Sequence, residues 1–175
     1  MKKETGVPVS PEQFRKGMRH VPTVVTVVTY DAMEGPIGLT IGSFVSLSLE
    51  PPLVCFNVQK DSTIHDSLVK ADRFLVHVLR DDQAAISDQF AVAELSTKEQ
   101  VQPGIIVDGP HGLPSLSAYL VRFDCRKTEV YDGGDHSIIL GCVEGIEEGS
   151  EARPIVYHQR AYHAIGTHVA DRSTP

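Results

Sequence analysis

Short hydroxyl side chains gather in one stretch of the sequence, GLTIGSFVSLSLEPP, which spans residues 38–52. Thr40, Ser43, Ser46 and Ser48 stand there among glycines. A solvated strand face more readily carries Lys, Glu or Gln, whereas short hydroxyls let a ligand approach the backbone and hydrogen-bond along its edge. We therefore expect a flat or anionic ligand beside this stretch. The alternative interpretation is an ordinary exposed strand face.

A second group of residues could bind an anion. The segment QKDSTIHDS contains Lys60, followed by Ser62 and Thr63 at the start of a predicted helix. Free N–H groups and the helix dipole favour an anion at a helix N-terminus. Asp61 or Ser62 could instead serve only as the N-cap, because capping uses the same N–H groups. Both interpretations stay open.

Two further segments carry side chains suited to a nucleotide and its reaction. His136 follows the Gly-rich turn 132–135, and an imidazole can orient a polar group or stabilise charge. The alternative is a solvated loop histidine. Arg160 in the segment YHQR suits phosphates, or else forms a surface salt bridge.

His158 and His163 fall on opposite faces of a single strand, so they cannot share a metal without a bend, and we expect no metal site.

Familiar nucleotide and hydrolase motifs are missing from the sequence. No GxGxxG follows a predicted strand, and GxxxxGK[ST] and GxSxG do not occur. These gaps argue against a Rossmann site, a P-loop and a serine-hydrolase nucleophile elbow.

Strand patterns dominate the chain. Residues 41–49 alternate with an apolar face on odd positions, and the proline pair 51–52 ends the run. Two long strands are predicted at AYLVRFDCRKTEVY and HSIILGCVEGIEE, joined by a turn. Ser10 and Gln13 form a capping box for one helix. We predict a mainly β fold, an antiparallel barrel with peripheral helices.

The composition limits the class of protein. The chain has 175 residues, 41% of them apolar and 22% charged, which fits one domain over 10–166 with a flexible N-terminal arm (1–9) and a polar C-terminal tail (167–175). The net charge of −7 argues against nucleic acid and anionic membranes as partners. We expect a cytoplasmic protein with no membrane span and three reduced cysteines.

Five segments of the sequence together resemble one known protein family. GLTIGSFVSLSLEPPLVCFNV resembles the signature of the short-chain NAD(P)H:flavin oxidoreductases, the FMN-binding split-barrel family. FRKGMRHVPTVVTVVTY, STIHDSLVKADRFLVHVLRDDQAAISDQFA, GDHSIILGCV and PIVYHQRAYH resemble other segments of that family, in the same order. The resemblance covers about residues 12–164.

This resemblance implies a dimeric antiparallel split β-barrel that holds FMN or FAD in a groove near the subunit interface. The flavin-contacting positions that it implies are Thr40, Ile41, Gly42, Ser43, Phe44, Ser46, Leu47, Asn57, Lys60, Ser62, Thr63, Phe90 and Ala91. For NADH or NADPH they are His136, Tyr157, His158, Gln159 and Arg160, with His136 as the catalytic residue.

The implied activity is hydride transfer from NAD(P)H to flavin, with the reduced flavin supplied to a flavin-dependent monooxygenase. Two alternatives remain: a split-barrel oxidoreductase that keeps its FMN and acts on another substrate, and a non-enzymatic haem- or flavin-binding barrel. The chain has Ile41-Gly42 where the family often has Ala-Asn. The missing amide leaves the choice between FMN and FAD open.

Overall fold

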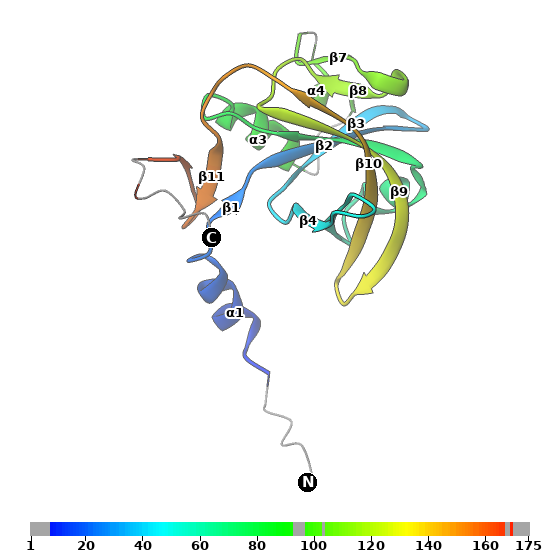
Figure 1. The fold of residues 1–175 in the computed structure, drawn as a ribbon. Helices are drawn as coiled ribbons and strands as arrows, with labels where there is room; N and C mark the ends of the chain where they lie inside the picture. The colour runs from blue at the N-terminus through cyan, green and yellow to red at the C-terminus, as the bar shows by residue number, and fades with distance from the viewer. Residues whose placement is uncertain (1–7, 93–96, 103, 167–168, 170–175) are drawn as a thin grey trace.

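The computed structural model describes residues 8–92, 97–102, 104–166 and 169. Seven strands form one sheet in the order β3-β2-β6-β9-β10-β5-β4. Their bounds are Thr26–Ala32 (β2), Gly35–Ile41 (β3), Val45–Ser48 (β4), Leu53–Gln59 (β5), Arg73–Val78 (β6), Val121–Gly133 (β9) and His136–Glu148 (β10). Figure 1 shows β2, β3, β9 and β10 of this sheet. Every neighbouring pair in this sheet is antiparallel.

Two smaller sheets and short helices lie around the main sheet. One small sheet has the order β1-β11-β12, and the other pairs β7 with β8. These strands are Thr23–Val24 (β1), Ile106–Asp108 (β7), Pro114–Leu116 (β8), Ile155–His158 (β11) and Ala161–Ala164 (β12). The helices are Pro11–Met18 (α1), His65–Lys70 (α2), Ala84–Ala91 (α3) and Thr97–Gln100 (α4), with a 3₁₀ turn at Pro110–Gly112 (η1).

One hydrophobic core joins the two halves of the main sheet. Val28 of β2, Phe56 of β5, Phe74 of β6 and Ile139 of β10 are fully buried in the same cluster. The rings of Phe56 and Phe74 meet edge to face at 5.3 Å, a favoured aromatic geometry. Strands from both ends of the sheet order can share this core only because the sheet curls. The predicted antiparallel, mainly β architecture is confirmed.

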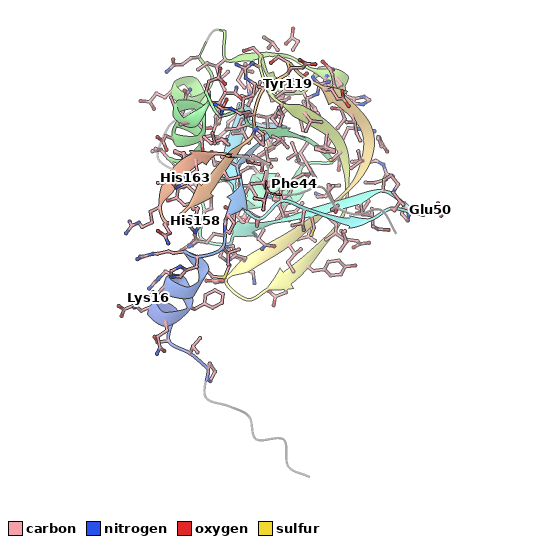
Figure 2. The ribbon with its side chains drawn as sticks, turned by 60° about the vertical axis from the view of Figure 1, so that its left-hand side comes forward. Lys16, Phe44, Glu50, Tyr119, His158 and His163 are labelled. Carbon is pink, nitrogen blue, oxygen red and sulfur yellow. The ribbon has the colours of Figure 1, made fainter. Side chains whose placement is uncertain are left out.

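The predicted strand 41–49 is broken. β3 ends at Ile41, and β4 begins only at Val45. Phe44, expected on the outer face, packs against the core, with its ring centroid 5.4 Å from that of Phe123 (Figure 2). The odd positions of β4 therefore point outward, and the side chains of Val45 and Leu47 are 53% exposed. The predicted alternation does not hold in β4, where Val45, Ser46 and Leu47 are all exposed.

Helix α2 begins later than the sequence suggests. Its N-cap is Ile64, and no side chain caps it, so the predicted capping by Asp61 or Ser62 is wrong. The backbone N–H of His65 donates to the carbonyl of Ser62 instead (3.1 Å). Ser62 and Thr63 therefore belong to the loop ahead of the helix.

Two features predicted from the sequence agree closely with the structure. Ser10 caps α1 with both hydrogen bonds of the capping box. The hairpin β9–β10 turns where predicted, with Gly134 at φ 82°, a conformation that glycine adopts without strain. None of the described helices has the length and apolarity needed to cross a membrane.

Candidate active site

The larger of two adjoining cavities lies between the end of β3, the loop before α2, the end of α3 and the start of β10. Its volume is about 720 Å³, within the range of small-molecule sites. The predicted residues that line it are Thr40, Ile41, Gly42, Ser43, Asn57, Ser62, Thr63, Phe90, Ala91 and His136. Residues far apart in the sequence thus meet at one place, as the resemblance implies.

The sequence reasoning missed other residues of this cavity, namely Gly38, Leu39, Val58, Gln59, Asp61, Ile64 and Gln100. Gln100 ends helix α4 and is buried. Its side-chain carbonyl accepts a hydrogen bond from the backbone N–H of Gly38 (3.4 Å). No local pattern signals this contact, because it depends on where α4 docks.

Gly38 lets helix α3 lie directly on β3. A Cβ atom built on Gly38 would lie 2.8 Å from the ring of Phe90, which is closer than real Cβ atoms come. Phe90 is buried, so it could not move aside freely. The missing side chain therefore brings Phe90 and Ala91 to the cavity wall.

The hydroxyls of β3 and the following turn have different hydrogen-bonding capacity. Thr40 Oγ1 donates to the carbonyl of Ser87 in α3 (2.6 Å), so its proton is committed and it can only accept from a ligand. Ser43 Oγ accepts from the backbone N–H of Asn57 (2.9 Å), which leaves its own proton to donate. One edge of the cavity therefore offers an acceptor and a donor close together.

The ring of His136 is oriented by its neighbour Asp135. Nδ1 of His136 lies 2.7 Å from Oδ1 of Asp135, and a carboxylate can only accept, so Nδ1 carries the proton. The same hydrogen bond lowers the pKa of Asp135 below its ordinary value. Nε2 is therefore the ring nitrogen left for a ligand. The sequence reasoning did not single out Asp135.

The second cavity, of about 470 Å³, adjoins the first and shares Thr40, Ile41, Gly42 and Ala91 with it. Its remaining wall comes from β1, α3 and the hairpin β11–β12, and is formed by Thr23, Val24, Val25, Ser87, Asp88, Tyr157, Arg160 and Tyr162. Because the same four residues line both cavities, ligands in the two cavities would lie close to each other.

The hairpin β11–β12 places Arg160 at the second cavity. Gln159 and Arg160 both have positive φ angles, 49° and 66°, as in a tight two-residue hairpin turn. The turn brings His158 and His163 to one side of the hairpin, with ring centroids 5.9 Å apart (Figure 2). The expectation of opposite faces is wrong, because the chain bends between the two histidines. Within the described part of the chain, no three potential metal ligands form a cluster.

Several predicted residues line neither cavity. Ser46 and Leu47 lie in β4, Phe44 packs on the core, and His158 and Gln159 belong to the hairpin outside both cavities. Lys60 lies beside the β9–β10 turn, where its ammonium donates to the carbonyl of Gly134 (2.7 Å) and pairs with the carboxylate of Asp132. Whether these residues contact a ligand stays a prediction.

Comparison with known proteins gives consistent results. A family model described as "Flavin reductase like domain" matches residues 18–166. FMN reductase (NADH) SmoA of Agrobacterium fabrum is 38% identical over 134 residues, 73% of this chain and 71% of that protein. The reductase component of 4-hydroxyphenylacetate 3-monooxygenase of Thermus thermophilus is 35% identical over 154 residues, 88% of this chain and 96% of that protein.

A solved structure also matches over nearly the whole fold. The NADH:FAD oxidoreductase SgcE6 of Streptomyces globisporus, in complex with NAD and FAD fragments, superposes with a TM-score of 0.81 at 32% sequence identity. The match covers 92% of this chain and 98% of that one.

Proposed function

The chain belongs to the flavin reductase family, and we propose that it transfers a hydride from NADH or NADPH to FMN or FAD. The observation that carries this proposal is the larger cavity, which gathers most of the residues that the family resemblance assigns to the flavin. Relatives named as NADH-dependent FMN reductases and as a monooxygenase reductase component support it.

The cavity suits a planar ring with apolar faces and a polar edge. Leu39, Ile41, Val58 and Phe90 supply buried apolar side chains among its lining residues. Thr40, Ser43, Asn57 and His136 supply hydrogen-bonding groups around them. A ligand buried in this way gains from apolar contact, while the few polar groups fix its orientation.

A bound flavin would supply the hydride acceptor and a dinucleotide the donor, so the protein needs no nucleophile. Ser43 donates a hydrogen bond to the ring edge, and Thr40 accepts one. His136 orients the dinucleotide's carboxamide through Nε2, because Asp135 holds its other ring nitrogen. Arg160 pairs with the dinucleotide phosphates from the adjoining cavity.

We further propose that the reduced flavin leaves for a flavin-dependent monooxygenase. A relative named as the reductase component of 4-hydroxyphenylacetate 3-monooxygenase supports this role. The three cysteines are all free, which supports work in a reducing compartment such as the cytoplasm. Residues 10–166 form the catalytic unit in this proposal.

A homodimer is the assembly that the exposed apolar surface favours. Val45, Leu47 and Leu49 of the β4 region are 53%, 53% and 85% exposed. Phe14 and Met18 of α1 are exposed as well, and this eight-residue helix buries none of its side chains. A helix of that length is marginal in water without packing, so a second copy that covers these surfaces would stabilise it.

A steady-state assay tests the activity. NADH and NADPH are each combined with FMN, FAD and riboflavin, and dihydronicotinamide oxidation is followed by absorbance. The proposal expects turnover only when flavin is added. A protein that retains its flavin through dialysis, and oxidises no NAD(P)H on flavin addition, supports the FMN-retaining alternative. A Soret band after haem addition with no flavin effect supports a haem-binding barrel.

A further inference from the structure

The turn that carries His136 is held by residues that do not line the cavity. The tip of this turn, Gly134 and Asp135, is solvent-exposed, while Asp132 and Gly133 end β9 and pair with Ser137 and His136. His136 nevertheless has to keep one position at the cavity. Contacts from outside the turn add to the sheet pairing of His136 with Gly133 and Gln59.

Lys60 makes three contacts with the turn. Its ammonium pairs with Asp132 and donates to the carbonyl of Gly134 at 2.7 Å, and its backbone N–H donates to the carbonyl of Asp135 at 3.0 Å. The lysine hydrogen bond lowers the pKa of Asp132, which keeps that carboxylate ionised. Lys60 follows β5 directly, and the last residue of β5, Gln59, pairs with His136 in the sheet.

His65 contacts Ser137, the neighbour of His136 in β10. Its Nε2 lies 2.9 Å from Oγ of Ser137, the residue after His136, and its Nδ1 lies 2.9 Å from Oδ1 of Asp66. Ser137 is only 6% exposed. His65 begins α2 directly after the cavity-lining loop 61–64. Lys60 and His65 therefore tie the two ends of this loop to the strand that carries His136.

We propose that Lys60 and His65 are positioning residues that hold His136 in place at the larger cavity, where it acts on the dinucleotide. Lys60 then acts through the turn and not on the flavin phosphate, because its ammonium and its backbone N–H both already hydrogen-bond to residues of the turn. The inference rests on the proposed flavin reductase function and assigns residues to that same site. It predicts that the effect of Lys60 on catalysis depends on His136.

Comparison of FMN with riboflavin separates positioning from phosphate binding. We expect Lys60→Met to lower kcat about tenfold with either flavin, since small misplacement of a reacting pair is costly. We expect the Kd of each flavin to stay within about twofold, and Lys60→Arg to recover most of kcat by pairing with Asp132. Lys70→Met, at an exposed position of α2, is the matched control and should behave as wild type. A weaker Kd for FMN, with riboflavin unaffected, would make Lys60 a phosphate ligand and overturn the proposal.

A double-mutant cycle tests the dependence on His136. In the His136→Ala background, we expect Lys60→Met or His65→Ala to cause no further loss of kcat, because residues that act through one group are not additive. Full additivity of the losses would contradict the proposal.

A spectroscopic readout keeps this test separate from the activity. In protein labelled with ¹⁵N-histidine and free of flavin, we expect the Nδ1–H signal of His136 to shift or broaden in Lys60→Met and not in Lys70→Met. Unchanged signals in both variants would contradict the positioning role of Lys60. If the wild-type protein reduces no flavin, the proposed function fails, and the NMR comparison still tests the positioning role.

Discussion

At the scale of single residues, neighbouring side chains decide what each polar group of the site can do. The Thr40 hydroxyl donates its proton to a carbonyl of α3, whereas the Ser43 hydroxyl accepts a hydrogen bond and can still donate. Asp135 fixes the tautomer of His136. The residue types were visible in the sequence. The partners of Thr40 and Ser43 were not, because they come from α3 and β5, which are distant in the chain.

His136→Ala should lower kcat with NADH about tenfold or more, while the flavin Kd changes little. The reason is that His136 acts on the orientation of the hydride donor. Steady-state kinetics and flavin-fluorescence titration measure the two quantities. His163→Ala, at a histidine that lines neither cavity, is the control. The reverse pattern would move His136 to the flavin site.

Arg160→Asn should raise KM for NADH several-fold and leave flavin binding unchanged, because it removes a phosphate-pairing charge. Asn tolerates the positive φ of this position, so the turn keeps its shape. Gln159→Asn, in the same turn but outside the cavity, is the matched control. An equal effect of both variants would indicate damage to the hairpin and not a lost charge.

At the scale of elements, the sequence correctly predicts the features that depend on interactions between residues close together in the chain. The capping box of α1 and the β9–β10 turn are correct because their determinants lie within a few residues. The break between β3 and β4 was missed because Phe44 turns inward to meet Phe123, a partner distant in the sequence. The β11–β12 turn was missed because Gln159 and Arg160 are not typical turn residues.

The buried His77 of β6 shows how one side chain joins elements. Its Nδ1 lies 3.1 Å from the carbonyl of Val27 in β2, and its Nε2 accepts from the backbone N–H of Leu116 in β8 at 3.2 Å. Burial lowers the pKa of His77 to about 3. The folded protein thus holds a neutral imidazole well below pH 6.5, whereas the unfolded chain protonates it.

The contribution of His77 to stability is therefore complete above about pH 6.5 and falls as the pH drops towards 3, by about 1.4 kcal/mol per pH unit. Urea midpoints measured across this range should fall less steeply for His77→Gln than for wild type, although the variant is less stable at neutral pH. Parallel pH profiles would show that His77 does not titrate differently on folding.

At the scale of the whole molecule, a curled antiparallel sheet brings together segments that are distant in the chain. The family resemblance assigns residues 40–43, 57, 62–63 and 90–91 to the flavin and residue 136 to the dinucleotide, and all of them line one cavity. It could not anticipate that two adjoining cavities share one wall, because that depends on how α3 and the β11–β12 hairpin dock.

The proposed dimer predicts that Phe14→Ser with Met18→Ser shifts the protein towards the monomer, because both side chains lose their apolar contact with a second copy. Light scattering over a concentration series measures the change. Met33→Ser, at a fully exposed methionine in the β2–β3 turn, is the control. A wild-type protein that is monomeric at every concentration would contradict the dimer.

A crystal structure of the protein with FMN tests the central claim most directly. The account predicts the isoalloxazine ring in the larger cavity, against residues 40–43, with His136 on the side where the dinucleotide enters. Flavin bound elsewhere, or a cavity closed by packed side chains in crystals that contain FMN, would contradict it.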